Sequence, residues 1–191
     1  MQGREEYLLS EAGRRQAAAR GRSLKSVLAG SGKTLVFTSP LCRARETAEI
    51  IAKEASLPEP VSIEELMEMS IGIWTGKNID KVKKDDPVLW DKFMARSWDA
   101  IPEAESSSVL YSRALKAWAL LRDAAAEQGA GNVIAVTHGG LLQWLLKSSF
   151  QSRTWFPLFP ISNCGLSKLC VEPKGQSVYM YWEEINSLVP D

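Results

Sequence analysis

The stretch VIAVTHGGLLQWLL, residues 133–146, runs from an apolar β-pattern through Thr-His-Gly-Gly into an apolar helical pattern. Its His138 is the single histidine of the 191-residue chain. A strand that delivers a histidine to the start of a helix is suited to holding a phosphate, because free N–H groups and the positive helix end lie beside it. The alternative is a histidine that is satisfied within a turn, and for a lone histidine this alternative is favoured until other residues argue against it.

Composition and charge predict one globular domain over residues 1–191, with 45% hydrophobic and 24% charged residues. The formal net charge is zero, which gives no indication of a nucleic-acid or acidic-membrane partner. No apolar run approaches the roughly 20 residues of a membrane helix, and no basic-then-apolar leader opens the chain. We therefore predict a cytoplasmic protein.

Several motifs that point to other chemistries fail on closer reading. The three cysteines, Cys42, Cys164 and Cys170, form no C-x-x-C pair, and their odd number argues against a disulfide framework. Scattered cysteines and one histidine also lead us to predict no metal and no cofactor. AGSGKT at residues 29–34 ends like a nucleotide-binding loop, but Val27 stands where that loop needs glycine.

Helical and β-patterns alternate along the chain, which predicts an α/β fold with a mostly parallel sheet between helices. The predicted helices cover residues 10–29, 44–55 and 106–128 and follow residue 138, and the predicted strands cover 34–38, 61–63, 133–137, 166–171 and 178–182. Residues 64–105 are irregular, and we interpret them as a capping excursion over a pocket mouth. The third helix should bury Val109, Leu110, Ala114, Ala117, Leu120 and Leu121.

Two more side chains suit a phosphate site. Arg43 lies just beyond the predicted strand 34–38, where an arginine can offer a two-pronged donor to a phosphate. Glu68 lies between two methionines, and burial there favours a protonated carboxyl group that can donate a proton to a departing alkoxide. The alternatives are a surface charge for Arg43 and a loop glutamate paired with Lys77 for Glu68.

Four motifs together resemble the histidine phosphatase superfamily, which is also called phosphoglycerate-mutase-like. They are LSEAGRRQA (9–17), TSPLCRARETAEII (38–51), the Glu-x-x-x-Gly-x-Trp-x-Gly segment (68–76) and VTHGG (136–140). Weaker matches are Glu105-Ser106 and the segment Ser-Asn-Cys-Gly at 162–165. The matches cover nearly the whole chain.

The resemblance implies a three-layer α/β/α sandwich with the site at the carboxyl ends of the strands and no metal. In the family, two histidines and two arginines surround the phosphate, and one histidine takes the phosphoryl group. By resemblance, Arg43 is the second clamping arginine, Glu68 the proton donor and His138 the second, stabilising histidine. The Gly139 amide and Asn163 are further candidates for phosphate contact. The implied ligand is a small phosphorylated metabolite.

One part of the family pattern is missing. The family's nucleophile lies in an Arg-His-Gly motif at the end of a central first strand, beside the strand that carries VTHGG. Gln2-Gly3 resembles the Gln-Gly that follows this motif, so we expect a truncated chain without that strand, its histidine and the first clamping arginine. The loss would leave unpaired backbone groups and an open slot. We predict reduced stability, or filling of the slot by a rearranged segment or a partner chain, as in a homo-oligomer.

Three functions remain open at this point. The first is phosphomonoester hydrolysis through a phosphohistidine in the complete form, with this chain inactive as given because it lacks the nucleophile. The second is a non-catalytic phosphate- or phosphoprotein-binding pseudoenzyme. The third is a phosphoglycerate mutase, which needs the same missing histidine and a longer insertion than residues 64–105 provide.

Overall fold

The computed structural model describes residues 1–175 and 177–189 of the chain. In chain order the helices and strands are α1 (Glu11–Val27), β1 (Thr34–Thr38), α2 (Cys42–Ala55), β2 (Val61–Ser62), α3 (Ile79–Asp85), α4 (Pro87–Arg96), α5 (Ser107–Gln128), β3 (Asn132–Val136), α6 (Gly139–Ser149), β4 (Leu166–Lys174) and β5 (Ser177–Ser187). Short 3-10 helices lie at Glu64–Leu66, Gly72–Trp74 and Ser97–Ala100. The predicted alternation of helices and strands is confirmed.

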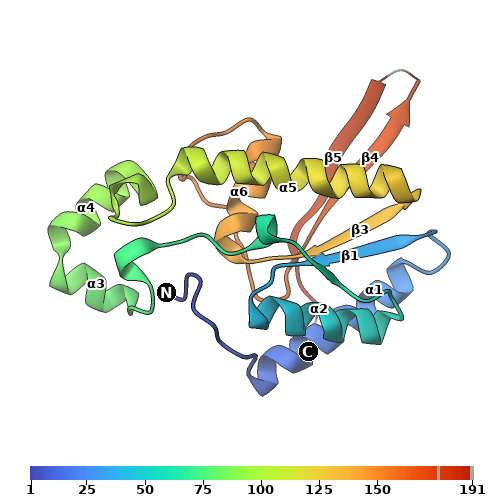
Figure 1. Cartoon of the computed structure of the whole chain (residues 1–191), viewed down its shortest axis with the longest axis horizontal. Helices are drawn as coiled ribbons and strands as arrows, with labels where there is room; N and C mark the ends of the chain where they lie inside the picture. Colours follow the sequence, from blue (N-terminus) through green and yellow to red (C-terminus); the bar gives the residue numbers. More distant parts are fainter. Residues whose placement is uncertain (176, 190–191) are drawn as a thin grey trace.

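A three-stranded parallel sheet in the order β2-β1-β3 forms the centre of the fold. Helices α1 and α2 cover one side of this sheet, and α5 and α6 cover the other (Figure 1). All five residues of β1 are buried, because β1 has a strand on each edge and helices on each face. The structure therefore has the α/β sandwich architecture that the sequence predicts.

The strands do not join into one sheet. Strands β4 and β5 pair with each other as an antiparallel hairpin, and no strand of the described residues pairs with the second edge of β3. The five residues of β3 are accordingly only half-buried. No rearranged strand pairs at this position in residues 1–175 and 177–189, whereas filling by a partner chain and reduced stability stay predictions.

Capping residues set the helix ends. Ser10 is the N-cap of α1, and its side chain accepts a hydrogen bond from the Gly13 N–H at 3.1 Å. Ser106 caps α5 in the same way, and Gly129 ends that helix with a left-handed φ of 60°. Helix α1 ends at Val27, two residues before the predicted end at residue 29, because Leu28 already forms its C-cap.

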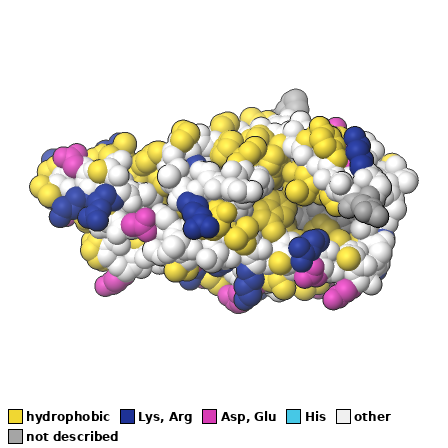
Figure 2. Space-filling view, turned by 90° about the horizontal axis from the view of Figure 1, so that it is seen from above, with side chains coloured by type: hydrophobic (Ala, Val, Ile, Leu, Met, Phe, Trp, Pro, Cys, Tyr) yellow, Lys and Arg dark blue, Asp and Glu magenta, His cyan; other side chains and the backbone are white. Residues whose placement is uncertain are grey.

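The buried face of α5 is narrower than predicted. Its buried residues are Leu110, Ala114, Ala117 and Leu121, which recur every three or four positions. The predicted core residues Val109 and Leu120 are 51% and 40% exposed, because each precedes a buried residue by one position and lies about 100° around the helix. Figure 2 shows hydrophobic side chains over much of one face of the molecule, interspersed with Lys, Arg, Asp and Glu side chains.

Residues 64–105 form a separate layer of short helices at one end of the molecule. Figure 1 places α3 and α4 beyond the carboxyl ends of β1 and β3. Their centre is Trp74, 2% exposed, whose ring lies 5.3 to 5.9 Å from those of Trp90, Phe93 and Trp98. This aromatic cluster gives the excursion a packed interior. Across the described residues, no helix is both long and apolar enough to cross a membrane.

We predict that Trp74→Ala lowers the free energy of unfolding by about 3–5 kcal/mol, because it empties the centre of the aromatic cluster. Urea unfolding followed by circular dichroism measures this loss. The matched control is Val88→Ala on α4, where the side chain is 64% exposed and the change should stay within about 0.5 kcal/mol. Equal effects of the two substitutions would show that the cluster is not a core.

We also predict that β3 amides exchange with solvent deuterium faster than β1 amides. Strand β1 is paired on both edges, whereas β3 is paired with β1 alone in the described residues. Native-state hydrogen exchange by NMR measures the two sets in one sample. Equal protection of β1 and β3 would mean that another strand covers the second edge of β3 in solution.

Candidate functional site

The candidate residues follow two parallel strands that end at the same edge of the sheet. Ser39 comes directly after β1, and Arg43 lies in the first turn of α2. His138 comes shortly after β3 and is the N-cap residue of α6. The register pairs Thr38 with Val136, so the two strands end side by side. This edge is where parallel α/β folds place their sites.

The guanidinium donors of Arg43 are bound by the N-terminal segment. Its Nη1 donates to the Glu5 carbonyl oxygen and its Nη2 to the Gly3 carbonyl oxygen, each at 2.7 Å. The carboxylates of Glu68 and Glu6 lie close enough to stabilise its charge, while burial lowers the pKa of the guanidinium group. Arg43 is therefore a part-buried cation held by two neutral acceptors.

His138 is 8% exposed, and its Nε2 lies 2.7 Å from the Ser39 Oγ. Burial, then the positive charges of Arg43 and Arg113, lowers the pKa of His138 to about 3. The imidazole is consequently neutral at pH 7. The Nε2 therefore has a hydrogen-bond partner, but this partner lies in another segment and not in the turn around His138.

Glu68 acts as a cap for α6. Its carboxylate accepts hydrogen bonds from the N–H groups of Gly140 at 3.1 Å, Leu141 at 3.0 Å and Met69 at 2.8 Å. Burial raises the pKa of the Glu68 carboxyl group, and it outweighs these donors, which favour the charged form. The raised pKa agrees with the expectation from the neighbouring methionines, and Lys77 is not among its hydrogen-bond partners in the described residues.

Two glycines open α6 and differ in what surrounds them. A Cβ on Gly140 would lie 2.5 Å from Glu68 Oε1 and 2.6 Å from Met69 Sδ, so only glycine lets the carboxylate approach. A Cβ on Gly139 would meet only the Ile161 side chain, at 3.8 Å. The Gly139 N–H forms no hydrogen bond within the described residues and is the free donor at the start of the helix.

An ion-pair network of half-buried Glu105 and Arg113 with exposed Arg4 lies behind the Glu68 loop. The Glu105 carboxylate accepts from Arg113 Nε and Nη2, both at 2.9 Å, in a two-pronged pair. It also accepts from Arg4 Nη2 at 2.8 Å and from the Ser70 N–H at 3.0 Å. Glu105 thus joins two arginines from distant parts of the chain to the loop.

Both arginines of this network also bind loop carbonyl groups. Arg113 Nη1 donates to the Met67 carbonyl oxygen at 2.5 Å and to that of Glu65 at 3.3 Å. Arg4 Nε donates to the Glu68 carbonyl oxygen at 2.8 Å. The backbone on both sides of the Glu68 side chain is therefore fixed by charge-assisted hydrogen bonds.

Asn163 lies in the wall of a cavity. It lines a cavity of about 510 Å³ together with Gln16, Arg20, Ser162, Cys164, Leu188 and Val189. Within the described part of the chain, no hydrogen bond joins Asn163 to Arg43 or His138. The structure thus brings Arg43, Glu68, His138 and Gly139 to one edge, and the contact of Asn163 with phosphate stays a prediction.

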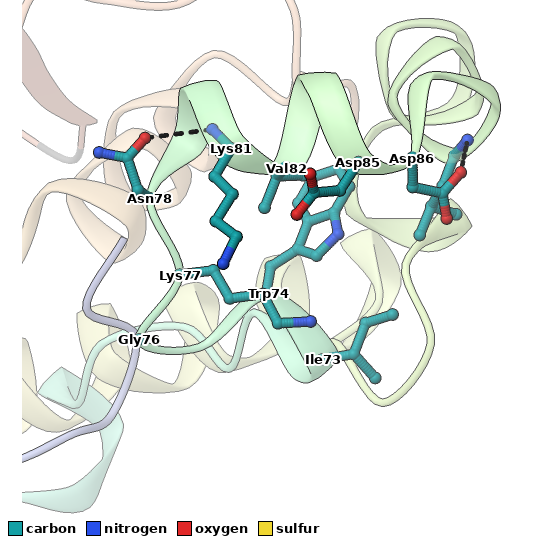
Figure 3. Close-up of a pocket in the computed structure, with 10 residues that line it drawn as sticks. Ile73, Trp74, Gly76, Lys77, Asn78, Lys81, Val82, Asp85 and Asp86 are labelled. Atoms are coloured by element: carbon teal, nitrogen blue, oxygen red, sulfur yellow. Dashed lines mark hydrogen bonds between the residues drawn. The ribbon is translucent and has the colours of Figure 1, made fainter.

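A second cavity, of about 390 Å³, lies in the excursion between Trp74 and α3. Figure 3 shows the Trp74 indole below α3, with the side chains of Lys81 and Asp85 bordering the space. None of the candidate phosphate residues lines it. This cavity therefore belongs to the excursion and not to the candidate site.

A sequence model of the histidine phosphatase superfamily (branch 1) matches residues 1–183. The chain belongs to the histidine phosphatase superfamily. The match extends over the motifs on which the resemblance rests, and confirms it.

Curated relatives of this chain include two proteins of Arabidopsis thaliana. A metal-independent phosphoserine phosphatase is 32% identical over 145 residues, which cover 75% of this chain and 58% of the relative. A phosphoglycerate mutase-like protein 4 is 31% identical over 154 residues, covering 80% of this chain and 64% of the relative. The chain thus spans 58% and 64% of the lengths of these two relatives.

Solved structures of similar fold include a protein titled mycobacterial hydrolase 2, with a TM-score of 0.83 and 24% identity over 100% of this chain and 84% of the other. A mycobacterial glucosyl-3-phosphoglycerate phosphatase in complex with VO3 has a TM-score of 0.79 and 26% identity, covering 98% and 90%. Bacillus stearothermophilus YhfR has a TM-score of 0.72 and 27% identity, covering 96% and 87%. These likenesses support the fold of the histidine phosphatase superfamily for this chain.

The structure adds residues to which the sequence assigns no role. Ser39, the serine of Thr-Ser-Pro, contacts His138 directly. Gly140, the second glycine of VTHGG, makes room for Glu68. The Glu105-Ser106 motif was a signal for the ion pair, but its partner Arg113 lies eight residues later on a helix and has no motif of its own. Their roles depend on contacts between distant segments.

We predict that Glu68 makes the protein less stable as the pH rises. A raised pKa means that the folded state holds the Glu68 proton more tightly than the unfolded chain does. Its stabilising contribution is complete below the ordinary value of 4.5 and is lost as the pH rises through the raised folded-state pKa. The free energy of unfolding of the wild type minus that of Glu68→Gln should therefore fall above pH 4.5.

Urea unfolding at a series of pH values measures this difference. Glu59→Gln is the matched control, because Glu59 is exposed and its substitution removes the same ionisable carboxyl group. A Glu68 difference that is flat with pH, or that rises with pH, would contradict the raised pKa.

Proposed function

We propose that this site binds the phosphoryl group of a small phosphorylated metabolite. The observation that carries the proposal is the convergence of Arg43, His138 and the free Gly139 N–H at the carboxyl ends of β1 and β3. Each of these groups can donate a hydrogen bond to a phosphate oxygen. Arg43 also supplies a positive charge, and the Gly139 N–H lies at the positive N-terminus of a helix.

Phosphate binding would replace the hydrogen-bond acceptors of Arg43. The guanidinium group now donates to two neutral carbonyl oxygens, of Gly3 and Glu5. Bonds to a charged phosphate are stronger than bonds to neutral carbonyl groups, so a phosphate can displace the N-terminal segment from the arginine. The position of residues 3–5 would then depend on whether the site is occupied.

The chemistry proposed for the complete site is phosphomonoester hydrolysis through a phosphohistidine. A histidine nitrogen would form a bond to phosphorus as the bond from phosphorus to the ester oxygen breaks. The departing alkoxide would take its proton from Glu68, whose raised pKa suits a proton donor. Water would then cleave the phosphorus–nitrogen bond and release phosphate.

The 191 residues contain no second histidine to perform the first step. We therefore propose that they bind phosphate but turn over a phosphomonoester at a negligible rate by themselves. A non-catalytic phosphate-binding role is the second candidate, and the same observation favours it. Phosphoserine is a reasonable first test ligand because one relative is a phosphoserine phosphatase. The cytoplasmic location stays a prediction.

We predict that inorganic phosphate raises the melting temperature of the wild-type chain and that Arg43→Ala weakens its affinity by about tenfold or more, since a charged hydrogen bond contributes roughly 1.5–3 kcal/mol. Thermal melts over a phosphate series give the affinity. The matched control is Arg45→Ala on the same helix, because Arg45 is exposed and its side chain forms a hydrogen bond with Cys42 and an ion pair with Glu49. Its effect should stay within about twofold.

Two outcomes would contradict the proposal. If phosphate stabilises Arg43→Ala as much as the wild type, Arg43 is not a phosphate ligand. If the chain hydrolyses p-nitrophenyl phosphate and His138→Ala leaves the rate unchanged, the assignment of a histidine-dependent site is wrong. Phosphate binding without hydrolysis supports the non-catalytic role of these residues.

A further inference from the structure

The pairing of β1 with β3 brings Ser39 to His138. The ladder continues past the strand ends, because the Ser39 N–H donates to the Val136 carbonyl oxygen at 2.9 Å. This bond fixes the serine backbone beside the end of β3. The Ser39 Oγ and the His138 Nε2 then lie 2.7 Å apart, although 99 positions separate them in the sequence.

The hydroxyl group of Ser39 has one proton to donate, and few hydrogen-bond acceptors lie within its reach. Ser39 is 0% exposed, so its hydroxyl group has no access to bulk solvent. Its Oγ accepts the Leu41 N–H at 3.2 Å, and among the described residues the His138 Nε2 is its other hydrogen-bond partner. If the ring donated to the hydroxyl group, the serine proton would be buried without an acceptor, which is costly. The hydroxyl group must therefore donate, and Nε2 must accept.

The imidazole has one proton in this environment. The charged groups that bear on it are Arg43 on α2 and Arg113 on α5, and both oppose a positive charge on the ring. A neutral imidazole whose Nε2 accepts a hydrogen bond carries its proton on Nδ1. Nδ1 forms no hydrogen bond within the described part of the chain, so it is the ring nitrogen left for a ligand.

We propose that Ser39 is a positioning residue that holds His138 as the Nδ1–H tautomer. His138 then offers the phosphoryl ligand an N–H donor instead of a lone pair. The lone pair on Nε2 is engaged by the serine, so neither ring nitrogen is available to attack phosphorus. The ligand part of this inference rests on the proposed function, whereas the tautomer itself does not.

The single histidine makes a direct experiment possible. A chain with 15N-labelled histidine gives the NMR signals of one imidazole, and long-range proton–nitrogen correlation shows which nitrogen carries the proton. At pH 7 we expect the Nδ1–H pattern. A wild-type spectrum with the proton on Nε2, or with two protonated nitrogens, would overturn the proposal.

Variants test whether the serine causes the preference. Ser39→Ala removes the donor, and we expect the tautomer ratio to shift about tenfold toward Nε2–H, equivalent to about 1.4 kcal/mol. Ser39→Thr keeps a hydroxyl group and should restore the Nδ1–H pattern. Tryptophan fluorescence confirms that each variant is folded. An unchanged ratio in folded Ser39→Ala would refute the role of Ser39.

Titration with inorganic phosphate separates this inference from the proposed function. If phosphate binds as proposed, the Nδ1 proton and nitrogen signals should shift, and Ser39→Ala should weaken the binding. If the wild type shows the Nδ1–H pattern but phosphate shifts nothing, the phosphate site is wrong while the positioning role of Ser39 stands.

Discussion

The site depends on the parallel pairing of β1 with β3. This pairing aligns Thr38 with Val136 and extends one hydrogen bond further, from Ser39 to Val136. A slip of the register by one residue would turn the side chains to opposite faces and separate Ser39 from His138. The placement of both residues, and of the helices that follow them, thus rests on a backbone ladder of five paired positions.

The second interaction on which the site depends is electrostatic, and it fixes the loop around Glu68. The loop around Glu68 has no regular ladder, and its backbone is bound by Arg4 and Arg113, which share the Glu105 carboxylate. Loss of one member would leave the half-buried Glu105 or Arg113 charge without a partner, which is costly. The position of Glu68 is consequently coupled to residues from α5 and from the N-terminal segment.

Local patterns in the sequence predict most of the fold. The capping serines, the glycine after α5 and the alternation of apolar runs set element types and most boundaries, because these depend on neighbouring residues. The division of the strands into two sheets was not predicted, since strand partners are set by tertiary contacts. Exposed Val109 and Leu120 show the same limit, because a helical period alone does not define how wide a face the neighbours cover.

For the site, sequence motifs located Arg43, Glu68 and His138, since each lies in a recognisable segment. They did not assign roles to Ser39, Gly140 or Arg113. Ser39 contacts a residue 99 positions away, and Gly140 contacts one 72 positions away. The predicted phosphate contact of Asn163 rests on the motif alone, and in the structure this residue lines a cavity together with Arg20. Motifs therefore find residue types, while hydrogen-bond partners require the structure.

The capping of α6 by Glu68 has a consequence for proton transfer. A carboxyl group that gives up its proton becomes an anion, and in most buried sites this new charge would need water or a rearranged side chain to stabilise it. Here the charge would appear opposite the N–H groups of Gly140 and Leu141, at the positive end of a helix that is already in place. The N–H groups at the start of helix α6 would thus stabilise the conjugate base without moving, because they already point at the carboxyl group before any proton leaves.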